Sequence, residues 1–213
     1  MKLDRRALLL YAVTDRSWLK DTTLAEAAEE AIKGGATMLQ YREKHICCWD
    51  LLMQAKELKA VARKYNVPFI VNDNLNVALA SEADGIHVGQ RDMDAAEARR
   101  KIGPNKILGV SVSTPEEARA AELAGADYLG TGAVFPTGTK PDAGAVSIET
   151  LKKICEAVSI PVVAIGGINP GNIMELKDSG AAGAAVVSAL FSAGDVAGAA
   201  AELRRLSESM VGV

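Results

Sequence analysis

The densest group of chemically useful side chains lies at the end of the apolar run 37–41. Gln40, Arg42 and Lys44 alternate along the chain, so in an extended segment they project from the same side. Two convergent cations beside a neutral hydrogen-bonding group suit a diphosphate, which an arginine can bind through two parallel hydrogen bonds. A solvent-exposed charged loop is the alternative that this motif leaves open.

Two aspartates follow the next two apolar runs. Asp73 comes directly after the run 68–72, which ends in Asn72, and Asp92 lies shortly after the run 85–88. If these runs are neighbouring barrel strands, the loops that follow them meet, and the two carboxylates can share one cation. Mg²⁺ is usually held by one or two carboxylates together with substrate phosphate oxygens. Each aspartate taken singly is also consistent with a turn or a helix cap.

Two further polar residues lie near the ends of apolar runs. Ser111 is the last residue of the run 107–111, which makes it a candidate for the same site. His87 lies one residue inside the end of its run, where a histidine is more often a hydrogen-bonded packing residue than a catalyst. We therefore expect Ser111, but not His87, to act on a ligand.

A segment rich in hydroxyl groups follows the apolar run 127–131. Thr137, Thr139 and Lys140 supply two hydroxyls and a cation around Gly138. This composition suits a mobile lid over an anionic substrate. A surface loop without a function is the alternative.

The last two apolar runs end in small or neutral residues. Gly166-Gly167 follows the run 161–165, and Val187-Ser188 ends the run 183–187. Barrels often bind phosphate between these two loops through backbone N–H groups, which glycine lets a ligand approach closely. The glycine pair is also consistent with tight packing alone. Together the motifs predict a cationic, metal-assisted anion site and a neutral backbone site, a pocket suited to joining two phosphorylated molecules.

These residues must be positioned by a repeating strand-and-helix fold. Short apolar runs alternate with longer segments of helical period, such as 50–64, which is typical of βα units and a parallel sheet. Thr114-Pro115 and Asn169-Pro170 each place a capping residue before a proline, so each predicts a helix start. We expect eight strands, at residues 7–13, 37–41, 68–72, 85–88, 107–111, 127–131, 161–165 and 183–187.

Eight such units predict a single (β/α)8 barrel of the TIM type over residues 1–213, forming one catalytic domain. A small residue or glutamate followed by alanine recurs before every second strand, and no linker or low-complexity segment interrupts the units. A doubly wound open sheet is the alternative, but it would normally show a glycine-rich fingerprint after its first strand. Val13 is followed instead by Thr14-Asp15-Arg16.

Composition excludes several classes of protein. The chain has 213 residues, 49% of them hydrophobic, and a net charge of −3, which argues against a disordered chain and a nucleic-acid partner. The apolar, charge-free stretch 179–194 is too short for a membrane span, so we expect no membrane partner. The unpaired spacing of Cys47, Cys48 and Cys155 indicates a reducing compartment. Residues 1–13 look more like a buried strand than a secretory signal, so we expect a cytoplasmic protein.

Taken in order, these motifs resemble the thiamine phosphate synthase family over essentially the whole chain. The motifs are Tyr11-Ala12-Val13-Thr14-Asp15, Gln40-x-Arg42-x-Lys44, Asn72-Asp73, Gly85-Ile86-His87-Val88-Gly89-Gln90-x-Asp92, Thr137-x-Thr139-Lys140, Ala164-Ile165-Gly166-Gly167-Ile168 and Val187-Ser188. The resemblance implies a barrel transferase of thiamine biosynthesis. It would join hydroxymethylpyrimidine diphosphate to thiazole phosphate with Mg²⁺, release pyrophosphate and form thiamine phosphate.

The resemblance also implies a role for each site residue. Those that would hold the pyrimidine diphosphate are Gln40, Arg42, Lys44, Asn72, Ser111 and Lys140, with Arg42, Lys44, Ser111 and Lys140 as the catalytic set. Those that would hold the thiazole phosphate are Thr137, Thr139, Gly167, Val187 and Ser188, and the metal ligands would be Asp73 and Asp92. Tyr41 departs from the leucine that is common in the family, but we expect its side chain to point away from Gln40 and Arg42.

In the mechanism that these residues suggest, the diphosphate leaves a carbon on an electron-rich aminopyrimidine and the thiazole nitrogen attacks directly. We therefore expect no nucleophilic side chain and no Ser-His-Asp or Cys-His arrangement. Two alternatives remain: a thiazole tautomerase on a similar barrel, and a non-catalytic phosphate-binding barrel. The sequence leaves the oligomeric state open, a homo-oligomer included.

Overall fold

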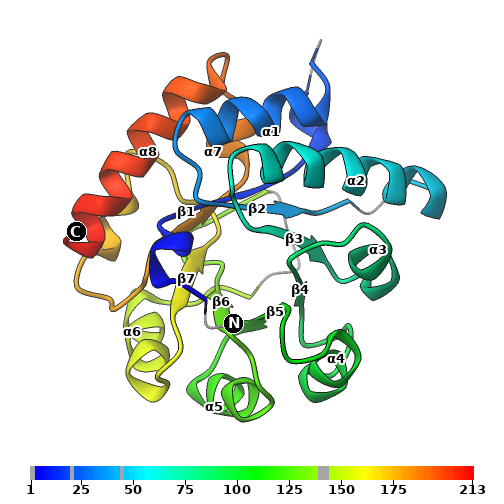
Figure 1. Cartoon of the computed structure of the whole chain (residues 1–213). Helices are drawn as coiled ribbons and strands as arrows, with labels where there is room; N and C mark the ends of the chain where they lie inside the picture. The colour runs from blue at the N-terminus through cyan, green and yellow to red at the C-terminus, as the bar shows by residue number, and fades with distance from the viewer. Residues whose placement is uncertain (1–2, 20–21, 44–45, 139–143) are drawn as a thin grey trace.

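In the computed structural model, eight parallel strands form a closed barrel surrounded by helices (Figure 1). The structure describes residues 3–19, 22–43, 46–138 and 144–213. The strands are β1 (Leu10–Val13), β2 (Met38–Tyr41), β3 (Phe69–Asn72), β4 (Gly85–Val88), β5 (Ile107–Val112), β6 (Tyr128–Thr131), β7 (Val162–Ile165) and β8 (Ala184–Val186). Each strand pairs with the next in sequence, and β8 pairs with β1, so the predicted (β/α)8 barrel is confirmed.

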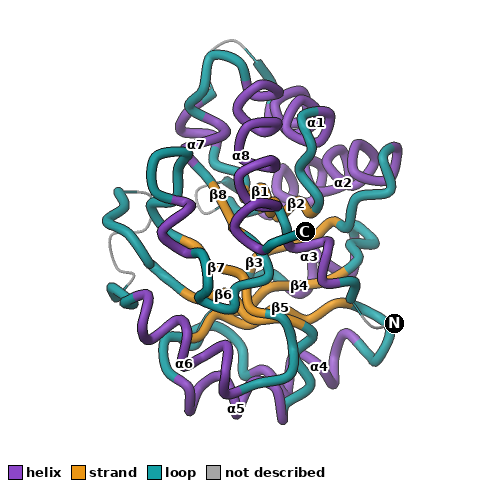
Figure 2. Tube along the Cα trace, turned by 90° about the vertical axis from the view of Figure 1, so that its left-hand side faces the viewer, coloured by secondary structure: helices purple, strands orange, loops and turns teal. Residues whose placement is uncertain are grey.

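Helices connect the strands and cover the outer face of the barrel, as the two views show (Figures 1 and 2). The α-helices are α1 (Leu24–Lys33), α2 (Cys48–Lys64), α3 (Leu75–Ala80), α4 (Ala95–Ile102), α5 (Pro115–Leu123), α6 (Ile148–Ala157), α7 (Ser188–Phe191) and α8 (Val196–Val211). The 3₁₀-helices are η1 (Arg5–Leu8), η2 (Arg16–Trp18) and η3 (Ile173–Leu176). Among the described residues, no helix is both long enough and apolar enough to cross a membrane.

The side chains of each strand alternate between the barrel interior and the helical layer. In β2, Met38 belongs to a small inner cluster with Tyr11 and Tyr128, whereas Leu39 and Tyr41 belong to the large cluster between sheet and helices. This period of two follows from the pleat of an extended chain. It is also the reason why residues two apart at a strand end face the same cavity.

Two predictions differ from the observed elements by more than two residues. The first strand begins at Leu10 and not at residue 7, because Asp4 accepts a hydrogen bond from the Arg6 N–H and starts η1 there. No helix begins at Asn169-Pro170, because the Asn169 side chain accepts from the Gly171 N–H at 2.9 Å and closes a turn. The seventh connection is therefore made by the short η3.

The helix start predicted at Thr114-Pro115 is confirmed. Thr114 is the N-cap of α5, and its hydroxyl accepts from the Glu117 N–H at 3.1 Å. The Glu117 carboxylate in turn accepts from the Ser113 N–H at 2.6 Å. These reciprocal bonds satisfy backbone donors at the start of the helix, directly after β5 and Ser111.

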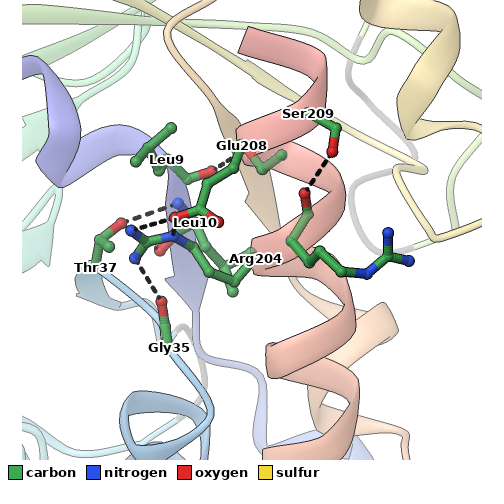
Figure 3. Close-up of polar contacts among 9 residues, drawn as sticks. Leu9, Leu10, Gly35, Thr37, Arg204, Glu208 and Ser209 are labelled. Carbon is green, nitrogen blue, oxygen red and sulfur yellow. Dashed lines mark hydrogen bonds and ion pairs between the residues drawn. The ribbon is translucent and has the colours of Figure 1, made fainter. Parts of the chain in front are cut away.

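The last helix joins the first units of the chain and so closes the fold (Figure 3). Arg204 of α8 forms an ion pair with Glu208 at 2.8 Å and donates to the Gly35 carbonyl at 3.2 Å. The Ser207 hydroxyl donates to the Leu9 carbonyl directly before β1. These contacts bring residues almost 200 positions apart together at the amino end of the barrel, the end opposite to the candidate site.

Candidate functional site

A cavity of about 590 Å³ opens among the carboxyl ends of the strands, a volume suited to small-molecule ligands. All of the predicted site residues that the structure describes line this cavity. They are Gln40, Arg42, Asn72, Asp73, Asp92, Ser111, Thr137, Gly167, Val187 and Ser188. The predicted residues Lys44, Thr139 and Lys140 lie outside the described residues.

The end of β2 is held in place by the end of β1. Thr14, which is fully buried, accepts from the Arg42 N–H through its hydroxyl oxygen at 3.1 Å, and its own N–H donates to the Gln40 carbonyl at 2.9 Å. These bonds extend the β1–β2 pairing beyond Val13↔Gln40. Gln40 and Arg42 therefore project into the cavity from a supported backbone.

Tyr41 lies on the other side of the same strand, as its alternation with Gln40 and Arg42 predicts. Its ring is buried in the helical layer, and its hydroxyl donates to Gln54 of α2 at 3.0 Å. The departure from leucine at this position therefore adds a hydrogen bond on the outside of the barrel and leaves the cavity wall unchanged.

The two aspartates are placed by their backbones. Asp73 has a φ of 58°, in the left-handed region that aspartate tolerates better than most residues, and its N–H donates to the His87 carbonyl at 2.8 Å. The Asp92 carboxylate accepts from the Gly89 N–H at 2.9 Å through Oδ2. The Asp92 bond uses one carboxylate oxygen and leaves the other for a ligand.

The two carboxylates suit a hard cation. The described residues contain no group of three or more His, Cys, Asp or Glu side chains that could hold a metal. Two carboxylates on one cavity are nevertheless the donor set expected for Mg²⁺ when substrate phosphate oxygens and water complete its coordination.

The glycine pair after β7 lets another loop pass close by. Gly166 and Gly167 have φ values of 103° and 65°, and a Cβ on Gly167 would lie 2.5 Å from the Pro136 carbonyl oxygen. The Phe135 N–H donates to the Gly166 carbonyl at 3.1 Å. Tight packing between the loops after β6 and β7 therefore accompanies the exposure of Gly167 to the cavity.

Val187 and Ser188 lie at the start of α7, a short extra helix between β8 and α8. The first N–H groups of a helix have no acceptor within it, and barrels commonly bind phosphate at the N-terminus of such a helix beside the loops of the last two strands. Both residues line the cavity next to Gly167. Among the described residues, this side of the cavity offers backbone donors and hydroxyls and no charged side chain.

A serine and a histidine meet at the cavity, which the sequence did not lead us to expect. Ser111 Oγ lies 2.9 Å from His87 Nε2, and His87 Nδ1 lies 3.0 Å from the Tyr128 hydroxyl. In a Ser-His-Asp triad a carboxylate occupies the Nδ1 position and stabilises the imidazolium. Here the Tyr128 hydroxyl lies beside Nδ1, in the place that the carboxylate takes in such a triad.

Tyr11 and Tyr128 are polar residues near the site that sequence reasoning missed. Their hydroxyls lie 2.7 Å apart inside the barrel, and Gln40 Nε2 donates to the Tyr11 hydroxyl at 2.7 Å. Burial raises the pKa of both tyrosines well above the ordinary value, so both hydroxyls keep their protons. Tyr128 has no signal in the sequence beyond its place in a strand, whereas Tyr11 belongs to the motif Tyr11-Ala12-Val13-Thr14-Asp15 of the family resemblance, which gave it no role.

Comparison with known proteins identifies close relatives of the chain. Residues 10–190 match the family described as thiamine monophosphate synthase. A thiamine-phosphate synthase of Ruminiclostridium cellulolyticum is 53% identical over 194 residues, which cover 91% of this chain and 92% of the relative. The corresponding protein of Clostridium tetani is 50% identical over 194 residues, covering 91% and 93%.

A solved structure agrees with these relatives. The thiamine phosphate pyrophosphorylase from Pyrococcus furiosus superimposes with a TM-score of 0.90 at 45% identity, covering 98% of this chain and 99% of that one. The barrel, the cavity residues and the similarity over most of both chains therefore agree, and the chain belongs to the thiamine monophosphate synthase family.

Proposed function

We propose that this chain is a thiamine phosphate synthase. It is a transferase that joins an aminopyrimidine diphosphate to a thiazole monophosphate, forms thiamine phosphate and releases pyrophosphate. Family membership supports the activity. The observation that carries the proposal is that one cavity, of about 590 Å³, collects charged residues on its β2–β4 side and uncharged residues on its β7–β8 side.

The charged side is the proposed site of the pyrimidine diphosphate. Gln40, Asn72 and Ser111 supply neutral hydrogen-bonding groups, and Arg42 supplies a cation for the diphosphate. Lys44 and Lys140 are proposed partners of the same group on the family resemblance. We assign the catalytic contribution to Arg42, Lys44, Ser111 and Lys140, since cations and hydroxyl donors stabilise the charge that develops on the departing pyrophosphate.

The neutral side is the proposed site of the thiazole monophosphate. Thr137, Gly167, Val187 and Ser188 surround it with hydroxyls and backbone N–H groups. Thr139 is proposed as a further contact on the family resemblance. A neutral cradle can hold a monophosphate without a second metal because several N–H donors share its charge.

Asp73 and Asp92 are the proposed ligands of Mg²⁺. Their carboxylates line the charged side, where a diphosphate would complete the coordination shell. The bound cation would supply positive charge to the departing pyrophosphate. The Gly89 N–H donates to the Asp92 carboxylate and the Asp73 N–H donates to the His87 carbonyl, which supports a metal site whose ligands are held in place by the backbone.

In the proposed reaction the bond between the pyrimidine methylene carbon and the diphosphate oxygen breaks, and the electron pair leaves with pyrophosphate. The thiazole nitrogen then forms the new bond to that carbon. Arg42 and Ser111 hold the leaving group, while the residues of the neutral side hold the thiazole close enough to attack. No side chain needs to form a covalent intermediate.

A coupled assay tests this function. The purified chain is mixed with both substrates, with and without EDTA, and thiamine phosphate and pyrophosphate are measured. We expect equal amounts of the two products and their loss with EDTA. Binding of each substrate without pyrophosphate release would indicate a binding module, and conversion of the thiazole tautomer alone would indicate an isomerase; either result contradicts the proposal.

We further propose that the chain acts as one catalytic domain in the cytoplasm on two small phosphorylated molecules. Three cysteines, Cys47, Cys48 and Cys155, are free thiols, which supports a reducing compartment. Thiol titration of denatured protein that was purified without reductant checks this location, and it would contradict the proposal if these cysteines were oxidised.

A further inference from the structure

Five polar side chains from five different strands form a continuous chain of hydrogen bonds inside the barrel. Gln40 Nε2 lies 2.7 Å from the Tyr11 hydroxyl, which lies 2.7 Å from the Tyr128 hydroxyl. The Tyr128 hydroxyl lies 3.0 Å from His87 Nδ1, and His87 Nε2 lies 2.9 Å from Ser111 Oγ. The two ends of this chain, Gln40 and Ser111, both line the cavity.

The barrel interior is shaped to admit these rings. Gly109 of β5 and Gly130 of β6 alternate with outward-facing residues, so each occupies an inward position. A Cβ on Gly109 would lie 2.2 Å from the Tyr128 ring and 2.5 Å from His87 Nδ1, and one on Gly130 would lie 3.1 Å from the His87 ring. Two strands thus lack side chains where the histidine and tyrosine meet.

All of the hydrogen bonds in this series are donated in the same direction, from Gln40 toward Ser111. The amide nitrogen of Gln40 can only donate, so Tyr11 accepts from it and must give its single hydrogen to Tyr128. Tyr128 then gives its hydrogen to His87 Nδ1, which must carry a lone pair. A neutral imidazole with a lone pair at Nδ1 carries its hydrogen at Nε2, and it donates that hydrogen to Ser111.

This sense of donation fixes what each end offers to a ligand. Gln40 uses its nitrogen inside the barrel, so its carbonyl oxygen is left as an acceptor. Ser111 accepts from His87, so its own hydrogen is left to be donated. The cavity therefore presents an acceptor suited to an amino group at Gln40 and a donor suited to an anionic oxygen at Ser111.

We infer that Tyr11, Tyr128 and His87 are positioning residues that lock the hydrogen-bonding sense of Gln40 and Ser111 and thereby select an amino-substituted pyrimidine over its oxo-substituted analogue. The inference rests on the proposed function for the identity of the substrate. The chain of bonds itself does not, so it can be tested separately.

The first test reads the histidine tautomer and needs no substrate. The protein is labelled with ¹⁵N-histidine, and His87 is distinguished from the other histidine, His45, by the loss of its signals in His87→Gln. In the wild type we expect a proton on Nε2 and none on Nδ1. In Gln40→Glu the carboxylate cannot donate, so Tyr11 must donate to it, the bonds to Tyr128 and His87 reverse, and Nδ1 gains a proton. An unprotonated Nδ1 in both proteins, or a protonated Nδ1 in the wild type, overturns the inference.

The second test measures selectivity in Tyr128→Phe, which keeps the ring and breaks the chain of bonds in its middle. We expect kcat/KM for the pyrimidine diphosphate to fall about tenfold, because both hydrogen bonds of the Tyr128 hydroxyl are lost and Gln40 is no longer held in one orientation. Discrimination against the oxo analogue should fall by a similar factor, because the Gln40 side-chain amide can then rotate and exchange the positions of its oxygen and nitrogen. The KM for thiazole phosphate should stay within about twofold, since its proposed contacts lie on the other side of the cavity.

Tyr41→Phe is the matched control. It removes the hydroxyl of an equally buried tyrosine that bonds to Gln54 on the outer side of the barrel. We expect a comparable fall in melting temperature without a change in kcat/KM or discrimination. Unchanged kinetics and discrimination in Tyr128→Phe overturn the inference. If the wild type itself makes no thiamine phosphate, the proposed function fails, and the tautomer test still decides whether the chain of bonds has the stated sense.

Discussion

The two sides of the cavity are lined by different kinds of residue. On the β2–β4 side the structure places side chains with formal charge, Arg42, Asp73 and Asp92. On the β7–β8 side it places Gly167, Val187 and Ser188, with the backbone of a short helix. In the proposed function the first side binds its ligand through charge and the second through backbone and hydroxyl donors, although both lie at the strand ends of a single barrel.

This difference bears on how a slightly acidic chain would bind the two phosphorylated molecules of the proposed function. With a net charge of −3 the protein has no general attraction for anions. A diphosphate that is to leave as pyrophosphate needs charges that act most strongly as it departs, whereas a monophosphate that is only held in place does not. We therefore expect changes on the charged side to affect turnover and changes on the neutral side to affect binding.

The largest effect should come from Arg42→Ala. Removing a cation from the departing pyrophosphate should lower kcat about 100-fold, the scale expected for one donor to a developing anion. Steady-state kinetics with each substrate varied in turn measures it, and the KM for thiazole phosphate should change little. Arg63→Ala, which removes an exposed arginine of α2 outside the cavity, is the control. A kcat close to that of the wild type would contradict the proposed role of Arg42 in stabilising the departing pyrophosphate.

Asp92→Asn should lower the apparent affinity of the enzyme for Mg²⁺. The substitution keeps the size of the side chain and removes its charge, so the Mg²⁺ concentration for half-maximal turnover should rise about 10- to 100-fold. Asp94→Asn is a close control, because Asp94 caps α4 through the Glu97 N–H and asparagine caps equally well. Equal metal requirements in the two variants would contradict the proposed metal site.

Gly167→Ala should affect the neutral side alone. A Cβ there meets the Pro136 carbonyl in a left-handed backbone, so the loop must shift and the KM for thiazole phosphate should rise about tenfold. The free energy of unfolding should fall by about 1–3 kcal/mol. Gly194→Ala, where a Cβ has open space, should change neither quantity. A rise in the KM for the pyrimidine diphosphate instead would contradict the proposal that each side of the cavity binds a different substrate.

The smallest effect concerns the pH dependence of the free energy of unfolding. It arises from Tyr11 and Tyr128, which contact Gln40 and His87 inside the barrel and lie outside the two proposed phosphate sites. Burial raises the pKa of Tyr11 and Tyr128 in the folded chain, while in the unfolded chain they ionise near pH about 10. Their contribution to stability is complete below that pH and is lost as the pH rises toward the folded pKa. Urea unfolding at alkaline pH should therefore show a slope shallower in Tyr128→Phe than in the wild type by up to about 1.4 kcal/mol per pH unit. Equal slopes in the two proteins would show that Tyr128 does not contribute to the loss of stability at alkaline pH.

Which side of a strand each side chain faces was largely predictable from the sequence. Gln40 and Arg42 face the cavity and Tyr41 faces α2 because a strand has a period of two, and this period can be read from neighbouring residues. The turn at Asn169 was not predictable from the same rules, because a capping residue before proline is compatible both with a helix start and with a closed turn. The structure has the turn, closed by the hydrogen bond from the Gly171 N–H to the Asn169 side chain.

The polar chain inside the barrel shows where sequence reasoning stops. Tyr11, His87 and Tyr128 are up to 117 positions apart, and each alone is consistent with ordinary packing in a strand. Their hydroxyls and ring nitrogens meet only because the barrel closes and because Gly109 and Gly130 leave room. The pairing of Ser111 with His87 became visible for the same reason.

The order of apolar runs and polar strand ends determined the barrel, its family and the residues that gather at its mouth, because these depend on local periodicity and on chain order. The tertiary structure decided which groups meet across the interior, that a tyrosine and not a carboxylate contacts His87 Nδ1, and which hydrogen each group can still donate. Hydrogen-bond partners depend on distances of about 3 Å between atoms far apart in sequence. Only the closed barrel sets those distances.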